Sequence, residues 1–330
     1  MLGVGIVGAG RISGAHAHAV ARHPELFLVG VAEPDEERRT RFVERFGGEG
    51  FSAYSELLER EEVRLVLVCL PHWLHAPVAI EAMEAGKHVM VEKPMAMTLE
   101  ECDAMIAAAE RNSVRLMVGH TQQFFAANRL AKRLLEEGTI GEVVMATETW
   151  YKPFGLAQRP SWFLDRSKGG GMWLMNGAHM LDRLLWFLGS RVVSVKGMVS
   201  NRILGLNADD SVMALLEFEN GAYATVQHCG WKRPERLIGP DELIGEIVGT
   251  EGMIKTVPYQ NRIWLRKENG EYQELDPGDR GGVTEELAAF VEAILTGRPE
   301  PIPNAHSREV VRLLLAVEES SRLGREVRLD

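Results

Sequence analysis

The sequence predicts an α/β protein of two domains, because three features coincide. The chain has 330 residues, which is more than one hydrophobic core usually organises. In its first third, short apolar runs alternate with amphipathic stretches of helical length, the pattern of βαβ units on a parallel sheet. From about residue 121, longer alternating stretches with turn signals such as Glu219-Asn220-Gly221 indicate an antiparallel or mixed sheet. We therefore place one domain at residues 1–120 and an α+β domain at residues 121–330.

The individual elements follow from the period of the apolar residues. The runs that predict buried strands of the first domain are Leu2–Val7, Leu26–Ala32, Leu65–Leu70, His88–Val91 and Arg115–Val118. The stretches with helical periodicity between them are Ile12–Arg22, Asp35–Phe46, Tyr54–Glu61, His75–Ala85 and Leu99–Arg111. Strands of the second domain are expected at Glu142–Tyr151, Val192–Val199, Ser211–Phe218, Ala222–His228, Leu243–Val248 and Arg262–Lys267. Its helices are expected at Asn128–Glu137, within Gly169–Phe187, and at Thr284–Leu295 and Ser307–Arg322.

The composition excludes several classes of protein. Apolar residues make up 45% and charged residues 25%, which is ordinary globular usage. A formal net charge of −10 argues against nucleic acid or an anionic membrane as partner, since both require clustered Lys and Arg. Three scattered cysteines, Cys69, Cys102 and Cys229, favour a reduced intracellular protein. The chain enters a predicted strand at once, and no apolar run approaches the roughly 20 residues that span a bilayer, so we expect a cytoplasmic protein.

A glycine-rich turn marks a candidate dinucleotide site. Gly8-Ala9-Gly10-Arg11-Ile12-Ser13 follows a predicted strand and opens a predicted helix, which is the context of a dinucleotide fingerprint. Gly8 would permit the tight turn and Gly10 the close approach of pyrophosphate to the backbone, with the helix dipole stabilising the phosphate. Ser13 stands where a third glycine or alanine is usual, and it is small enough for close packing. The turn predicts a Rossmann domain with Gly8, Gly10, Arg11 and Ile12 at the cofactor.

An acidic residue after the second predicted strand bears on the choice of cofactor. Glu33 follows the glycine turn by about 20 residues, where a carboxylate can accept hydrogen bonds from the adenosine ribose. The same carboxylate would repel a 2′-phosphate, so NAD is favoured over NADP. Arg38 and Arg39 lie just beyond and could support NADP, and a solvated loop acid is the alternative for Glu33.

Further motifs carry a resemblance to a known family. Cys69-Leu70-Pro71-His72-Trp73-Leu74-His75 is followed by Ala85-Gly86-Lys87-His88-Val89-Met90-Val91-Glu92-Lys93-Pro94. Val118-Gly119-His120, Gly169-Gly170-Gly171, His179 and Asp182 then follow in order. This series resembles the glucose-fructose oxidoreductase and inositol dehydrogenase family, Gfo/Idh/MocA, along most of the chain. The Glu-Lys-Pro element is its most specific part.

The resemblance implies a Rossmann domain joined to an α+β domain with a large, open, mostly antiparallel sheet. One side of that sheet would face the active site, and the other often forms an oligomer interface, so a homodimer or homotetramer is expected. Lys93 would hydrogen-bond the reacting oxygen, and His179 would act as general base or acid. Residues that would lie near the nicotinamide are Leu70, Pro71, His75, Glu92 and Lys93. Pro94 is expected to follow a cis peptide bond, which would direct Lys93.

The chemistry of these residue types agrees with the implied roles. Removing hydride from a carbinol carbon requires removal of the hydroxyl proton, and the reverse reaction requires a donor to the carbonyl oxygen. A lysine beside a cationic nicotinamide can share that proton, and histidine titrates in the working range. The alternatives are a surface ion-pair lysine for Lys93 and a hydrogen-bonded structural histidine for His179.

Two departures from the family pattern affect the expected substrate. The aspartate that stands four residues before the histidine in inositol dehydrogenases is Met175 here, and Asn176 would point about 100° further round an α-helix. Asp182 could orient His179 from the same helical face. Arginine is frequent soon after His120, but Thr121-Gln122-Gln123-Phe124 stands here, and glutamines favour neutral hydroxyls. A neutral sugar or polyol is therefore expected, although Tyr151, Lys152, Arg159 and Arg166 could supply donors or charge.

Several aromatic and histidine residues are further candidates for the site. Trp162, Trp173 and Trp73 could each pack on the C–H face of a sugar or serve as core. His16 and His18 point to different helix faces, and His72 and His75 have no evident third ligand, so no metal is expected. The candidate substrate residues are His120, Gln123, Tyr151, Trp162, Asn176, His179 and Asp182.

These observations favour an NAD(P)-dependent oxidoreductase acting on CH–OH groups of a sugar, inositol or related polyol. One alternative is an NAD-dependent glycoside hydrolase that transiently oxidises a sugar. Another is a nucleotide-binding regulator without catalysis, which the presence of Lys93 and His179 disfavours. The sugar, the oxidised carbon and the physiological direction depend on loops whose specificity the sequence leaves open.

Overall fold

The computed structural model describes residues 1–231, 242–267 and 270–329. These residues form two compact units. Unit 1 contains residues 1–121 and 283–308, and unit 2 contains residues 122–282 and 309–330. Residues 283–308, which the sequence placed with the second domain, therefore group with the first.

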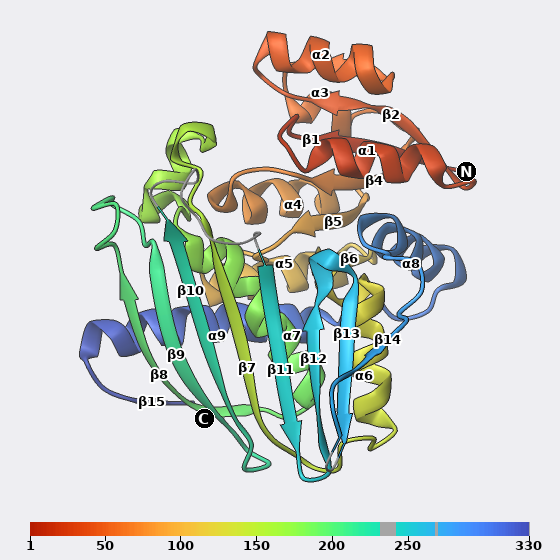
Figure 1. The fold of residues 1–330 in the computed structure, drawn as a ribbon. Coiled ribbons are helices and arrows are strands. Elements are labelled where there is room, and N and C mark those ends of the chain that lie inside the picture. The colour runs from red at the N-terminus through yellow and green to blue at the C-terminus, as the bar shows by residue number, and fades with distance from the viewer. Residues whose placement is uncertain (232–241, 268–269, 330) are drawn as a thin grey trace. The chain divides into compact units, whose positions relative to one another are not determined.

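Unit 1 is built on a six-stranded, entirely parallel sheet in the order β3-β2-β1-β4-β5-β6 (Figure 1). Its strands are β1 Leu2–Val7, β2 Leu26–Ala32, β3 Glu49–Phe51, β4 Val63–Val68, β5 His88–Glu92 and β6 Leu116–Gly119. Its helices are α1 Ser13–Arg22, α2 Glu36–Phe46, α3 Tyr54–Leu58, η1 His72–Leu74, α4 His75–Glu84, α5 Leu99–Arg111 and α8 Val283–Thr296. The order reverses direction beside β1, which is the switch point where parallel sheets bind nucleotides.

The predicted elements of unit 1 are confirmed within a few residues, and the structure adds β3, which was not expected. This strand has three residues and pairs only with β2 at the edge of the sheet, so it is too short to give a period. The predicted cis peptide bond at Lys93-Pro94 is present.

Unit 2 is built on a nine-stranded sheet in the order β14-β13-β12-β11-β7-β10-β9-β8-β15. Its strands are β7 Val143–Pro153, β8 Val192–Ser200, β9 Ser211–Phe218, β10 Tyr223–Trp231, β11 Glu242–Gly249, β12 Gly252–Val257, β13 Arg262–Lys267, β14 Gln273–Leu275 and β15 Val327–Arg328. Neighbouring strands are antiparallel except β7 and β10, which are parallel. The sheet is thus mostly antiparallel, as predicted, but β12, β14 and β15 were not expected.

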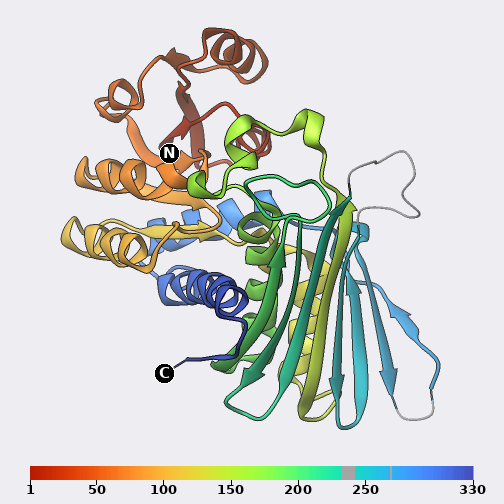
Figure 2. The same cartoon turned by 90° about the vertical axis from the view of Figure 1, so that its left-hand side faces the viewer.

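Helices cover one face of this sheet. They are α6 Ala126–Glu136, α7 Ala178–Leu188 and α9 Asn304–Leu323, whose first residues belong to unit 1. The short helices are η2 Thr121–Phe124, η3 Leu156–Gln158, η4 Ser161–Leu164, η5 Arg166–Lys168, η6 Trp173–Gly177 and η8 Pro258–Gln260. Figure 2 shows α6 in yellow and α7 in green on the same side of the sheet. In the described part of the chain, no helix lies on the opposite face.

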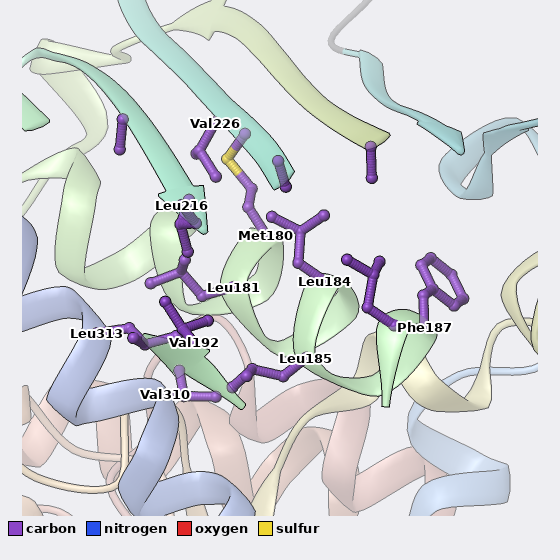
Figure 3. Packing of buried hydrophobic residues seen from close by; sticks show 14 of the residues in the cluster. Met180, Leu181, Leu184, Leu185, Phe187, Val192, Leu216, Val226, Val310 and Leu313 are labelled. Atoms are coloured by element: carbon purple, nitrogen blue, oxygen red, sulfur yellow. The ribbon is translucent and has the colours of Figure 1, made fainter. Parts of the chain in front are cut away.

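The core of unit 2 lies between this sheet and its helices (Figure 3). Met180, Leu181 and Leu184 of α7 point toward Leu216 of β9 and Val226 of β10. Each fully buried side chain of this size contributes about 1.5–3 kcal/mol by leaving water. This packing fixes α7, and therefore His179 near its start, against the sheet.

None of the helices within residues 1–231, 242–267 and 270–329 combines the length and the apolar character that a bilayer crossing requires. The cytoplasmic location stays a prediction of the sequence.

Candidate functional site

The glycine turn of unit 1 has the geometry that a dinucleotide requires. Gly8 follows β1 and has a φ of 97°, and a Cβ there would lie 2.5 Å from the carbonyl oxygen of Cys69. Only glycine fits both conditions. A Cβ on Gly10 would find Cys69 O at 4.0 Å as its nearest atom, so protein does not fill the space beside this residue.

The first turn of α1 completes this cradle. Ile12 precedes α1 without capping it through a side chain, and Ser13 Oγ donates to Gly10 O at 2.5 Å. The first N–H groups of a helix have no partner within the helix, and a pyrophosphate can satisfy them. The residues from Gly8 to Ser13 therefore fit a dinucleotide.

Glu33 closes the other side of the turn. Its carboxylate accepts the N–H of Ala9 at 2.9 Å and that of Asp35 at 3.2 Å. Arg39 Nη1 donates to Glu33 O at 2.7 Å, and the Arg38 side chain lies 3.6 Å from Asp35. Glu33 is therefore held at the glycine turn, and the side chains of Arg38 and Arg39 each contact a neighbouring residue.

His75 connects the two motifs of the family resemblance. Its Nδ1 lies 2.8 Å from Pro94 O and its Nε2 lies 2.9 Å from Leu70 O, so the ring ties the end of β4 to the turn after β5. Burial lowers the pKa of His75, and the nearby charge of Lys93 acts in the same direction. His75 thus positions the segments on which Pro71 and Lys93 lie.

Glu92 has a partner that the sequence did not suggest. His16 of α1 lies with Nε2 2.8 Å from Glu92 Oε1, although His16 was considered only as a metal ligand. Burial acts to raise the pKa of Glu92, but the hydrogen bond and charge of His16, together with Lys93 and His75, lower it on balance. The carboxylate beside Lys93 is therefore held in its ionised form.

The end of β6 brings a second carboxylate to this region. Glu286 of α8 is buried and accepts from Thr121 Oγ1 at 2.9 Å. A Cβ on Gly119 would lie 3.6 Å from Glu92 Oε1 and 3.7 Å from Glu286 Oε1. His120 is buried and meets the ring of His306 at 5.7 Å. Glu286 could not be found from the sequence, because it lies more than 160 residues from Gly119.

In unit 2, the helix before His179 is not α-helical throughout. Trp173–Gly177 forms a π-helix that continues into α7, so the angle inferred for Asn176 from α-helical geometry is wrong. Asp209 accepts the N–H groups of Met172 at 3.0 Å and Trp173 at 2.7 Å. A Cβ on Gly171 would collide with this carboxylate, which explains the glycine.

Four side chains gather around Trp150 of β7. Its ring centroid lies 6.1 Å from that of His179, 6.0 Å from that of His228 and 5.5 Å from that of Tyr259. Lys152 Nζ lies 4.2 Å from the same ring. We call Trp150, Lys152, His179, His228 and Tyr259 the Trp150 cluster. Asn176 contacts this cluster, because its Nδ2 lies 3.0 Å from His228 Nε2.

Burial determines the charge of His228. The residue is 1% exposed, and burial lowers its pKa to about 3, with the positive charges of Lys152 and Arg159 acting in the same direction. His228 is therefore neutral at physiological pH. Because the Asn176 amide nitrogen can only donate, His228 Nε2 is the acceptor and its proton lies on Nδ1.

Several predicted substrate residues have other contacts. Gln123 Nε2 donates to Asp182 Oδ1 at 2.6 Å, so these two candidates bond to each other. Tyr151 points to the opposite face of β7, where its hydroxyl donates to Gln227 at 2.8 Å. Trp162 packs edge-on against buried Phe163 at 5.6 Å.

Two further residues that the sequence offered as candidates, Trp173 and Arg166, also belong to the fold. Trp173 is fully buried and its Nε1 donates to Leu314 O at 3.0 Å, so it is core. Arg166 bonds to Glu318 through both Nε, at 2.6 Å, and Nη2, at 2.5 Å. Two of the donors that the sequence suggested near the glycine-rich loop lie close to His179. Lys152 belongs to the Trp150 cluster. Arg159 contacts the π-helix, with its Nη1 3.4 Å from Met175 Sδ.

Within residues 1–231, 242–267 and 270–329, no group of three or more His, Cys, Asp or Glu side chains is arranged to hold a metal ion.

Comparison with known proteins relates both units to one family. Residues 2–120 match the "Oxidoreductase family, NAD-binding Rossmann fold", and residues 128–255 match the "GFO/IDH/MocA C-terminal domain". The myo-inositol 2-dehydrogenase of Thermotoga maritima is 26% identical, over 99% of this chain and 98% of its own.

Solved structures share the fold along the whole chain. Levoglucosan dehydrogenase, solved with NADH and levoglucosan, superposes with a TM-score of 0.88 and 26% identity over 99% of each chain. The WlbA dehydrogenase of Bordetella pertussis, solved with NADH and UDP-GlcNAcA, gives a TM-score of 0.88 and 26% identity over 100% of this chain and 98% of its own. With the cradle between Gly8 and Glu33, these findings show that the chain is a Gfo/Idh/MocA family oxidoreductase with an NAD-binding Rossmann domain.

Proposed function

We propose that the protein transfers hydride between a nicotinamide cofactor and a CH–OH group of a sugar, inositol or related polyol. The observation that carries the proposal is the Trp150 cluster. Around buried Trp150 it brings together the partly exposed rings of His179 and Tyr259, and the face of Tyr259 suits the C–H surface of a sugar. The substrates in the names of the compared proteins, myo-inositol and levoglucosan, support this class.

Each proposed role belongs to a residue whose chemistry suits it. When bound, the nicotinamide accepts or supplies the hydride. Lys93 would donate a hydrogen bond to the reacting oxygen, with the carboxylate of Glu92 as its neighbour in sequence. His179 would accept the hydroxyl proton during oxidation and return it during reduction. Gly8, Gly10, Arg11 and Ile12 would hold the pyrophosphate, and Glu33 the adenosine ribose.

The test is a screen at 340 nm of inositols, aldoses, polyols and their keto forms, in both directions and with both cofactors. Lys93→Ala and His179→Ala should each lower turnover at least about a hundredfold, as loss of acid–base catalysis does, while calorimetric NADH binding stays near normal. Lys267→Ala, which removes an exposed lysine at the end of β13, is the matched control.

Two other outcomes would reject these roles. Near-normal turnover in either variant would remove that residue from the mechanism. Release of a leaving group without NADH accumulation would instead identify the glycoside hydrolase alternative.

We also propose that a second copy of the chain packs on the uncovered face of the nine-stranded sheet. Met198 of β8 and Met213 of β9 are register partners on this face and are 74% and 59% exposed. Leu215 and Tyr223 extend the apolar surface. Met213→Glu should shift the mass measured by light scattering from oligomer to monomer. Gln273→Glu, at an exposed position of β14 on the other edge of the sheet, should have less effect.

A further inference from the structure

His16 lies on the helix that begins at the dinucleotide turn. It belongs to α1, whose first N–H groups we assign to the pyrophosphate, and it is 2% exposed. Its Nε2 lies 2.8 Å from Oε1 of Glu92 at the end of β5, although the two residues are 76 positions apart. One helix of unit 1 thus reaches both the expected pyrophosphate site and the residue before Lys93.

The chemistry of this pair assigns its proton. Burial acts to raise the pKa of Glu92, but its hydrogen bond with His16 and the neighbouring charges lower it on balance, so the carboxylate is ionised. An ionised carboxylate only accepts hydrogen bonds, and His16 Nε2 is therefore the donor. The titratable groups that face Glu92 are His16 of α1, Lys93 of the following turn, His75 of α4, Cys69 after β4 and, across Gly119, Glu286 of α8.

A purely structural role explains His16 poorly. Among the residues that the structure describes, its buried Nδ1 has no hydrogen-bond partner. Burying a polar atom without a partner is unfavourable, and an apolar side chain of similar volume would fill the same place without that penalty. The buried positions that follow on the helix, Ala17, Ala19 and Val20, are apolar. The bond to Glu92 is therefore the feature that favours histidine at this position.

The segment that carries Lys93 is held on both sides of this residue. His16 bonds the side chain of Glu92, and His75 Nδ1 lies 2.8 Å from Pro94 O. The backbone of Glu92 also pairs with Gly119 of β6. Lys93 lies between these anchors, so a shift of its backbone would break at least one of the contacts.

We propose that His16 is a positioning residue, which fixes Glu92 and through it Lys93 while the same helix holds the cofactor. This inference rests on the proposed function, in which Lys93 hydrogen-bonds the reacting oxygen. The N–H groups for the pyrophosphate and the ring of His16 belong to one helix of ten residues, which would align the cofactor with the lysine. A misplacement of about 1 Å can lower a rate about a hundredfold, so the loss should appear in kcat rather than in cofactor binding.

The variants separate the imidazole ring from its hydrogen bond. His16→Phe keeps a planar ring but cannot donate, whereas His16→Gln keeps a donor at about the reach of Nε2. With the best substrate of the 340 nm screen, kcat should fall about tenfold to a hundredfold in His16→Phe and return to within about threefold of wild type in His16→Gln. In both variants, KM and the calorimetric Kd of NADH should stay within about threefold. His18→Phe, at an exposed position of the same helix, is the matched control and should change nothing.

A double-mutant cycle tests whether the effect passes through Glu92. In a Glu92→Gln background, His16→Phe should lower kcat by less than about twofold further, because its partner is already changed. An equal loss of kcat in the two backgrounds would overturn the inference. So would a His16→Phe enzyme whose KM and NADH affinity fall as far as its kcat, since that pattern indicates general damage to the fold.

The unfolding of the protein without cofactor gives a readout that does not depend on turnover. In the wild type, the lowered pKa of Glu92 contributes stability that is present above its unfolded value and lost as pH falls. Without His16, burial raises the pKa of Glu92 and makes its ionised form unfavourable. The gap in Tm between wild type and His16→Phe should therefore be small near about pH 4 and widen toward about pH 8.

Failure of the inference and of the proposed function are distinguishable. If Lys93→Ala loses turnover while His16→Phe keeps near-normal kcat, the function stands and the positioning role is rejected. If no member of the screen is oxidised, the proposed function fails and the Tm profile alone decides the inference. A gap that widens with pH would support the coupling of His16 to Glu92, and a constant gap would reject it.

Discussion

The carboxylate of Glu33 should determine which nicotinamide cofactor the enzyme uses, and Glu33→Gln tests this with little structural change. Glu33 is 9% exposed and accepts the N–H of Ala9, inside the glycine turn, at 2.9 Å. The glutamine side chain retains an oxygen for this N–H, so the variant removes the charge and keeps the acceptor.

The magnitude follows from simple electrostatics. Two unit charges about 5 Å apart repel by about 3 kcal/mol at an effective dielectric constant near 20. The 2′-phosphate of NADP carries more than one charge, and solvent screening offsets part of the repulsion, so removing the Glu33 charge should favour NADP by about 2–3 kcal/mol, or roughly 30- to 150-fold. Replacing a charged acceptor of the NAD ribose with a neutral one should cost about 1 kcal/mol, roughly fivefold. The preference for NAD over NADP should therefore fall by at least about a hundredfold.

The assay is kcat/KM with each cofactor at 340 nm for the wild type and the variant. Glu37→Gln, which neutralises an exposed carboxylate of α2, is the matched control and should leave the ratio unchanged. If the ratio in Glu33→Gln stays within about threefold of wild type, or if the wild type prefers NADP, the reasoning is refuted.

Three further predictions concern the stability of the fold and the binding of the cofactor. Burial raises the pKa of Glu148 to about 8, so the carboxylate that faces buried Arg183 is fully ionised only above that pH. In urea titration at about pH 9, Glu148→Gln should therefore lower the free energy of unfolding by about 3–5 kcal/mol, whereas adding Arg183→Met should restore part of the loss; additive losses would contradict the coupling. Burial raises the pKa of Asp209 to about 7, above its unfolded value, so its contribution to stability is complete below about pH 4 and declines as pH rises to about 7. Asp209→Asn should flatten the Tm profile over that interval, and an unchanged profile would exclude this group. Gly8→Ala should weaken NADH binding at least tenfold by calorimetry, because the left-handed φ and the contact with Cys69 O both oppose a Cβ.

The cofactor side of the protein could largely be predicted from the sequence, because its determinants are local. The turn at Gly8 and the acid at Glu33 depend on residues near one strand end, and the short spacing between them is fixed by one βαβ unit. The Lys93-Pro94 bond likewise belongs to a compact motif. Such features can be predicted without knowing which strands pair.

The proposed substrate side depends on contacts between residues that are distant in sequence. His228 meets Trp150 because β10 runs parallel to β7 in a specific register, 78 residues apart along the chain. The sequence does contain one signal: His228 continues the inward alternation of Ala224 and Val226, which is an unusual place for a polar side chain. Asn176 was misplaced because periodicity alone does not distinguish a π-helix from an α-helix.

Unit 1 consists of two separate segments of the chain, and this limits how its domains can be exchanged between related enzymes. The chain changes unit after Thr121, after Gly282 and after Arg308. Within unit 1, α8 packs on α1 and buries Leu287, Phe290 and Val291. A chimaera that exchanged residues 1–120 alone would join the α1 of one parent to the α8 of another and mismatch this packing. A workable exchange of cofactor modules between relatives needs two grafts, the N-terminal segment together with residues 283–308, so a single genetic crossover would rarely yield a stable hybrid.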